Sequence, residues 1–349
     1  MTDRPHTPSG ARPRVTFALF AFNQEDFVRE AIESAFAQDY GPLEIILSDD
    51  CSTDRTYEIM QQMAATYDGP HRVIARRNPF NLGTALHVQS AFDASSGDLF
   101  VVAAGDDIST PDRVTALTKA WDAAGRPEGA VHSGRESFRD GRTIARVPAK
   151  RTTYSGRDLE GYAEGYWLPA AAPTCAYTRG VFERFGPLLG GSIIEDAPLF
   201  LRVALIGEFI ACNQPLVRHR LHDANSGTGY GIGSPARWNR FIQSKVIAFR
   251  TMQTDLARWT GPLDPELRAR IERRILAVLQ SAPGLLIPET QPIGRLARIR
   301  LGLRIATAPA VARTFALRAD YVLGFFGFDV HNRLKTRLRP LIGRFRRTG

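Results

Sequence analysis

Strand-like and helix-like segments alternate four times within residues 15–104, and this alternation constrains the fold more than any other feature of the chain. Each short apolar run is followed by a longer segment in which apolar residues recur every three to four positions. The pattern predicts a parallel sheet covered by helices, with right-handed crossovers. The four expected strands are Val15–Phe20, Leu43–Ser48, Arg72–Ala75 and Leu99–Ala104.

The last of these strands ends on two adjacent carboxylates, Asp106 and Asp107. In open α/β sheets, ligands bind beyond the carboxyl ends of the strands. Carboxylate oxygens in that position suit Mg²⁺ or Mn²⁺ holding the phosphates of a substrate. The alternative is a plain junction of strand and turn, where Asp is common for conformational reasons.

Beyond this unit the pattern is less regular. Residues 135–180 are rich in Gly, Pro, Arg and aromatic residues, so we expect hairpins and walls of a site there rather than sheet core. A helix should follow Glu195-Asp196 and end at Gly207, before two short strands, Glu208–Cys212 and Leu216–Leu221. The expected division is a flexible lead-in (1–13), an α/β domain (14–235, ending in a glycine-rich loop at 227–235) and a helical, basic region (236–349).

Composition indicates a globular protein, with 44% hydrophobic and 23% charged residues. Its three cysteines show no metal-ligand spacing, and its polar N-terminus does not resemble a signal peptide, so we expect a cytoplasmic protein. No uncharged stretch is long enough to span a membrane. Thirteen Arg or Lys and two Asp give residues 294–349 a net charge of +11, which leaves −2 for the rest of the chain.

Six short motifs occur in order over about two-thirds of the chain, residues 14–226, and together they resemble the inverting family-two glycosyltransferases of bacterial glycan assembly. The resemblance implies the GT-A fold, which is a Rossmann-like, mixed and mostly parallel sheet flanked by helices, here with a C-terminal helical extension. The motifs are Ala21-Phe22-Asn23-Gln24-Glu25, Asp49-Asp50-Cys51-Ser52-Thr53-Asp54-Arg55-Thr56, Asn81-Leu82-Gly83, Gly105-Asp106-Asp107, Glu195-Asp196 and His222.

The resemblance places a nucleotide at the first strand ends. Phe22 can form an apolar wall for the base, and Asp50 can accept from its ring NH; the alternative, that Asp50 caps the next helix, we assign instead to Ser52 or Asp54. Gly83 lets the backbone approach the nucleotide closely, and it can at the same time serve a helix cap. The expected nucleotide-binding residues are Phe20, Phe22, Asn23, Asp50, Asn81, Gly83 and Asp106.

The same resemblance implies a metal site and a catalytic base. Asp106 and Asp107 resemble the family's Asp-x-Asp motif, with Ala104 at the usual first Asp, so either carboxylate can bind Mn²⁺ or Mg²⁺. His222 is a third candidate ligand, or a structural histidine. Glu195 and Asp196 resemble the base motif, with Asp196 as the base; the alternative is that acidic residues simply favour the first turn of a helix.

The expected reaction is transfer of one sugar, with inversion, from a nucleotide-diphosphate donor (a UDP-sugar) to a glycan or lipid-linked acceptor in surface polysaccharide assembly. A processive synthase is disfavoured because Ser234 stands where the Gln-x-x-Arg-Trp motif has Gln. Nucleotidyltransferases and dinucleotide oxidoreductases are disfavoured because no glycine-rich loop follows a strand. The alternative class is a catalytically silent scaffold, or a polyanion-binding protein that acts through its basic tail; nucleic acid is not an expected partner.

The tail itself has a helical stripe flanked by arginines. With the upstream aromatic residues, this pattern favours contact with an anionic membrane surface. The alternative is a basic helix packed on its own domain or on a second subunit. The stripe consists of Leu334, Leu338, Leu341, Ile342 and Phe345.

Overall fold

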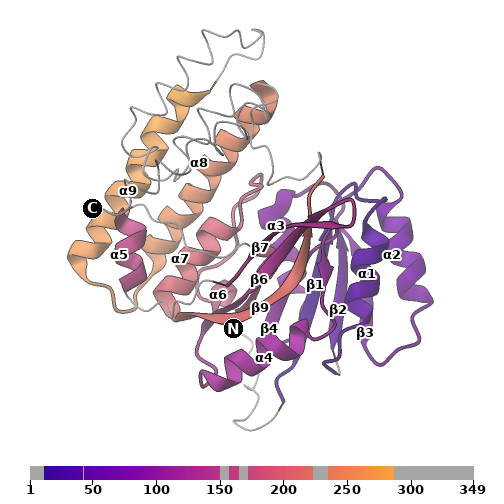
Figure 1. Ribbon diagram of the computed structural model, residues 1–349. Helices are drawn as coiled ribbons and strands as arrows, with labels where there is room; N and C mark the ends of the chain where they lie inside the picture. Colours follow the sequence, from indigo (N-terminus) through magenta and orange to yellow (C-terminus); the bar gives the residue numbers. More distant parts are fainter. Residues whose placement is uncertain (1–11, 42, 150–156, 165–171, 223–234, 287–349) are drawn as a thin grey trace.

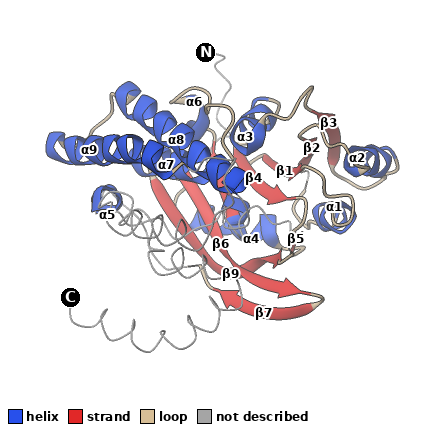
Figure 2. Ribbon diagram, turned by 90° about the horizontal axis from the view of Figure 1, so that it is seen from above, coloured by secondary structure: helices blue, strands red, loops and turns tan. Residues whose placement is uncertain are grey.

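The computed structural model describes residues 12–41, 43–149, 157–164, 172–222 and 235–286. Within them, a nine-stranded mixed sheet carries helices on both faces, and a group of helices extends from one side (Figures 1 and 2). From β1 to α3 the elements alternate as the sequence predicts: β1 (Val15–Ala21), α1 (Val28–Phe36), β2 (Glu44–Asp49), α2 (Thr56–Ala65), β3 (Arg72–Arg77) and α3 (Gly83–Asp93). The next strand, β4 (Leu99–Ala104), has the predicted bounds.

The second half of the fold is less regular. It continues through β5 (Ile108–Ser109), α4 (Arg113–Ala123), β6 (Gly129–Arg139), β7 (Arg142–Val147) and α5 (Arg157–Glu164). A 3₁₀ turn (Ala172–Thr174), β8 (Cys175–Thr178), α6 (Gly180–Glu183), α7 (Asp196–Ile206) and β9 (Glu208–Arg220) follow. The described chain ends with α8 (Pro235–Arg258), α9 (Pro265–Ser281) and a 3₁₀ turn (Ala282–Leu285).

Strand order is β3-β2-β1-β4-β8-β6-β9-β5, with β7 paired to β6. The first four strands in this order are parallel, so β1, β2 and β4 all end at the same edge of the sheet. α1, α2 and α4 pack on one face, and α3, α6 and α7 pack on the other. A third apolar cluster joins α5, α7, α8 and α9, so α7 belongs to both the sheet domain and the helical extension. The fold is GT-A.

Two expectations for the second half were wrong. The segment 135–180 was expected to stay out of the sheet core, yet β8 pairs antiparallel with both β4 and β6 at its centre. All four of its residues are buried, so neither face shows the polar alternation by which a strand is recognised. The two strands expected at Glu208–Cys212 and Leu216–Leu221 are one strand, β9, whose pairing to β6 shifts near Pro215 because proline has no N–H for the ladder.

Several expectations lie on residues that the structure does not describe. These are residues 1–11 of the lead-in, the glycine-rich stretch 227–234, and the basic stripe with its membrane or subunit contact. In the described ranges, none of the helices has the length and apolar character that a membrane crossing requires.

Candidate active site

Asp50 lies at the end of β2 and holds the loop that leads into α3. Its carboxylate accepts hydrogen bonds from Nδ2 of Asn78 (2.7 Å) and from the backbone N–H groups of Leu82 (2.9 Å) and Gly83 (3.0 Å). Asp50 is buried. With one of its two oxygens accepting twice, at most one acceptor position remains for the N–H of a base. Asp54, rather than Asp50, accepts from the first N–H of α2, that of Thr56 (2.9 Å).

Phe20, in β1, and Phe22, just after it, lie in different surroundings. Phe20 packs in the core, with its ring centre 5.0 Å from that of His87 and 6.3 Å from that of Phe100. Phe22 is 45% exposed, so its ring is the one that a nucleotide base can reach. Asn23 has a positive φ of 51°, and its Oδ1 accepts from the N–H of Thr53 (2.8 Å), which ties the β1 end to the β2 end.

Gly83, the first residue of α3, lies close to the segment that leads to α7. Its φ is +73°, and a Cβ there would lie 3.3 Å from the carbonyl oxygen of Ser192. That carbonyl accepts from the N–H of Ala85 (3.1 Å). The side chain of Asn81 also accepts from Gly83 N–H (3.1 Å). The 189–196 segment therefore packs on the first turn of α3. The contact is at Ser192, four residues before Asp196.

Asp106 and Asp107 each lie against a histidine from the end of β9 or just beyond it. Oδ2 of Asp106 is 3.0 Å from Nε2 of His222. Oδ1 of Asp107 is 3.0 Å from Nδ1 of His219 and accepts from the backbone N–H of Arg220 (3.0 Å). Burial, with the neighbouring Asp107 carboxylate, raises the pKa of Asp106. Asp106 and His222 are therefore the pair that can share a cation, while Asp107 is engaged with β9.

The distance between the candidate ligand atoms of Asp106 and His222 tests whether a divalent cation fits between them. Two neighbouring ligands on an octahedral ion with bonds of about 2.1 Å lie about 3 Å apart, and this is the spacing of the Asp106 and His222 atoms. Across the described part of the chain, no group of three or more His, Cys, Asp or Glu side chains is arranged so that it could hold a metal ion by itself. A cation held here would thus depend on phosphate and water for its other ligands, as Mg²⁺ commonly does.

Glu195 and Asp196 stand at the beginning of α7, on the side of the sheet that carries α3. Both are half-buried. Burial, with the Asp196 carboxylate beside it, raises the pKa of Glu195 to about 8. Burial also raises the pKa of Asp196, against the opposing charge of Lys245. Burial therefore raises the pKa of both adjacent carboxylates, and the charge of Lys245 opposes this shift at Asp196.

Comparison with known proteins shows a family likeness. Residues 16–185, just under half of the chain, match the family model described as Glycosyl transferase family 2. Over this segment the chain is similar to glycosyl transferase family 2. The segment contains β1 to β8 and hence Asp50, Gly83, Asp106 and Asp107, whereas Asp196 and His222 lie beyond it.

Named relatives match only part of the chain. The succinoglycan biosynthesis protein ExoO of Rhizobium meliloti is 31% identical over 173 residues, which is 49% of this chain and 48% of ExoO. The putative glycosyltransferase EpsE of Bacillus subtilis is 35% identical over 102 residues, which is 29% of this chain and 36% of EpsE. The chain thus aligns with about half of ExoO or less than half of EpsE.

Solved structures extend the fold comparison past the family-2 segment. S. aureus TarS, residues 1–349, in complex with UDP-GlcNAc, has a TM-score of 0.57 at 14% identity and covers 95% of this chain and 87% of its own. The mannosyltransferase PcManGT of Pyrobaculum calidifontis, in complex with GDP-Man and Mn²⁺, has a TM-score of 0.51 at 19% identity, with 93% and 90% covered. At these identities the likeness shows the fold.

The sequence analysis did not assign two residues near the candidate site, His219 and Lys245. His219 contacts Asp107, and the signal was its place on the same expected strand as His222, three residues earlier. Lys245 acts on Asp196 from α8, 49 positions further along the chain, where no motif marks it.

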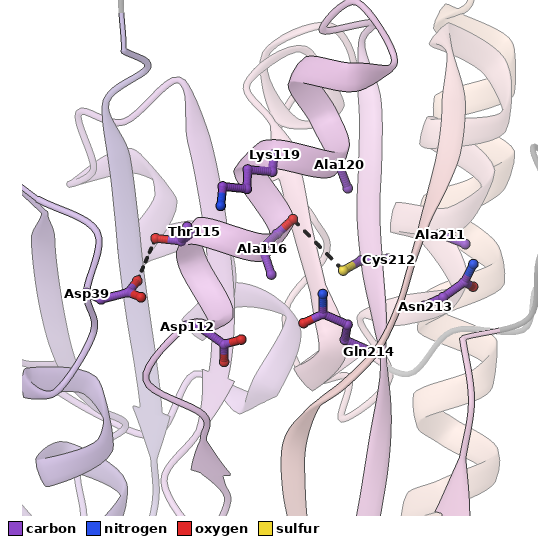
Figure 3. Close-up of a pocket in the computed structure, with 10 residues that line it drawn as sticks. All are labelled: Asp39, Asp112, Thr115, Ala116, Lys119, Ala120, Ala211, Cys212, Asn213 and Gln214. Carbon is purple, nitrogen blue, oxygen red and sulfur yellow. Dashed lines mark hydrogen bonds between the residues drawn. The ribbon is translucent and has the colours of Figure 1, made fainter.

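A polar pocket of about 430 Å³ lies away from these residues, between α4 and the middle of β9 (Figure 3). Asp39 and Thr115 face each other at its rim, and Sγ of Cys212 points to the carbonyl of Ala116. None of the predicted site residues lines this pocket.

Proposed function

We propose that the protein is a metal-dependent, inverting and non-processive glycosyltransferase that moves one sugar from a nucleotide-diphosphate donor to a hydroxyl acceptor. The observation that carries the proposal is the contact between Gly83 and Ser192. It links the loop held by Asp50 to the segment that leads into Asp196, and this supports a base that acts on a donor bound at the strand ends.

The donor would occupy the ends of β1, β2 and β4. Phe22 offers an exposed ring for the base, and Asp50 retains one acceptor position. Asp106 and His222 would hold Mn²⁺ or Mg²⁺, which neutralises charge on the departing diphosphate. The structures of TarS with UDP-GlcNAc and of PcManGT with GDP-Man and Mn²⁺ support a nucleotide-sugar donor on this fold, and we favour a UDP-sugar.

Asp196 would act as the general base. Inversion requires the acceptor hydroxyl to attack the anomeric carbon from the side opposite the diphosphate while a base takes its proton. An ionised carboxylate at Asp196 performs this role, whereas Glu195, with a pKa of about 8, holds its own proton at neutral pH. Glu195 would then donate a hydrogen bond to the acceptor or to Asp196.

The acceptor would be a growing glycan or a lipid-linked saccharide in surface polysaccharide assembly. This assignment rests on the relatives, which include ExoO, named for succinoglycan biosynthesis, and the putative colanic acid biosynthesis glycosyl transferase WcaA of Escherichia coli.

The direct test is turnover of a panel of nucleotide sugars by the wild type and by Asp196→Asn, with Mn²⁺ or Mg²⁺. We expect wild-type turnover with at least one donor, and a variant that binds the same nucleotide but transfers no sugar. Retained transfer in the variant would remove Asp196 from the base role. Nucleotide binding with no turnover of any donor by the wild type would favour a catalytically silent scaffold.

A further inference from the structure

α8 lies outside the family-2 match, yet it contacts the segment that carries the proposed base. The hydroxyl of Ser192 donates to the carbonyl oxygen of Ser244 (3.0 Å), and the N–H of Ile193 donates to the Ser244 hydroxyl (3.3 Å). Two turns further along α8, the hydroxyl of Thr251 accepts a hydrogen bond from the N–H of Leu189 (3.4 Å). One face of α8 thus supports the 189–196 segment along its length.

A buried ion pair fixes α7 and α8 relative to each other. Arg202 of α7 donates through Nε and Nη2 to the two carboxylate oxygens of Asp255 of α8, at 2.7 and 2.9 Å. The two side chains are 0% and 2% exposed. A planar, two-bond contact of this kind defines orientation as well as distance. The ion pair therefore holds α8 in a fixed orientation against α7.

Lys245 is the residue that follows Ser244. Its Nζ lies 5.2 Å from the ring centre of Phe241, one turn earlier on α8, and its side chain is half-buried. Ser244, its neighbour on α8, is hydrogen-bonded to Ser192 and Ile193, which precede Asp196 by four and three residues. The charge of Lys245 opposes the rise that burial causes in the pKa of Asp196. A cation thus lies near the proposed base, on a helix that is itself hydrogen-bonded to the segment before that base.

We propose that Lys245 is a positioning residue, whose ammonium group keeps Asp196 ionised and oriented toward the acceptor hydroxyl. This inference rests on the proposed function, since it assumes that Asp196 is the base. It assigns to the C-terminal helical extension a direct part in catalysis, in addition to its packing against α7.

The other groups around Asp196 make such a cation necessary. Glu195 is adjacent to it in the chain, and Tyr177 and Cys175 of β8 are within electrostatic reach of Asp196. None of the three provides a positive charge, and burial alone raises the pKa of Asp196. Arg274 of α9 acts on Lys245, and together with burial it lowers the pKa of Lys245 to about 8. Lys245 is thus charged at neutral pH, where Asp196 must be ionised.

The test is the pH dependence of kcat/KM for Lys245→Met and Lys245→Arg. Loss of the positive charge raises the pKa of Asp196, so the acid limb of the Met variant should move up by about one pH unit. Activity should recover as the pH rises, and the Arg variant should restore the wild-type limb. The nucleotide affinity of each variant, measured with Mn²⁺, should equal that of the wild type. Lys119→Met, at an exposed position on α4, is the matched control and should leave the profile unchanged.

Two results would overturn the proposal. If the acid limb of Lys245→Met coincides with the wild-type limb, the positive charge of Lys245 does not affect the pKa of Asp196. A loss that is equal at every pH, and that Arg does not restore, would show a purely structural role. Retained transfer in Asp196→Asn would instead contradict the proposed function itself, whatever the Lys245 variants do.

Discussion

Nε2 of His222 lies 3.0 Å from Oδ2 of Asp106, although 116 positions separate the two residues in the chain. The imidazole also packs against Phe27, the residue before α1, with ring centres 4.4 Å apart and the ring planes tilted by 33°. The end of β9 therefore meets the end of β4 at a point that α1 supports. We place a cation there because Asp106 and His222 bring two metal-ligating atoms close together.

Replacing His222 with Ala should weaken metal binding. The variant loses one of two protein ligands, so the Mn²⁺ concentration for half-maximal donor hydrolysis should rise at least about tenfold. His219→Ala should have a smaller effect, because His219 contacts Asp107 rather than Asp106. Titration of activity with Mn²⁺ measures both. A His222→Ala variant with the wild-type metal dependence would exclude His222 as a ligand.

Replacing Gly83 with Ala should lower both stability and transfer. The left-handed φ costs about 1–2 kcal/mol for a residue with a Cβ, and here that Cβ also presses on the Ser192 carbonyl. Displacement of the 189–196 segment should reduce kcat by about 10- to 100-fold. Gly141→Ala is the control, because Gly141 has a φ of +74° and nothing within 4 Å of the added Cβ. Equal kcat losses in both variants would contradict the assigned contact.

Breaking the ion pair between α7 and α8 should be strongly destabilising. Arg202→Met leaves the Asp255 carboxylate buried without its cation, which should lower the free energy of unfolding by about 3–5 kcal/mol. Glu58→Gln removes an ion pair whose side chains are 70% and 69% exposed, so its effect should stay within about 0.5 kcal/mol. Urea unfolding measures both variants. Similar midpoints for Arg202→Met and the wild type would refute a structural role for the pair.

Acid should destabilise the protein in part through His132 on β6. This imidazole is 1% exposed, and burial lowers its pKa to about 4 from a usual value near 6.5. The unfolded chain therefore binds the proton more readily, and this contribution to stability is lost as the pH falls from 6.5 toward 4. Between pH 7.5 and pH 5, the unfolding free energy of the wild type should fall by about 2 kcal/mol relative to that of His132→Leu. A pH-independent difference between the two proteins would contradict this account.

Much of the fold could be predicted because its first half has regular periods. The strand at Leu99–Ala104 is apolar throughout and bounded by glycines, and it has the predicted limits. β8 could not be predicted in this way, since four residues buried on both faces carry no period. β9 was divided in two because Pro215 normally marks a break, whereas here the strand continues through a shift in pairing.

The candidate site was predictable where each residue follows a strand directly. Asp50, Asp106 and Asp107 were found in that way, and the parallel strands bring their backbones to one edge. Which hydrogen bonds their side chains make depends on residues far along the chain, such as His219 for Asp107. Lys245 has no sequence signal at all, because only the packing of α8 on α7 brings its charge to Asp196.

The central claim is that the ends of β1, β2 and β4 bind a nucleoside diphosphate together with a divalent cation. Calorimetric titration of UDP and GDP into the protein, with and without Mn²⁺, tests it most directly. We predict binding of at least one nucleotide that requires Mn²⁺ in the wild type and is lost in Asp106→Asn. Absence of heat with either nucleotide in the presence of Mn²⁺, or equal affinity in Asp106→Asn, would contradict the claim.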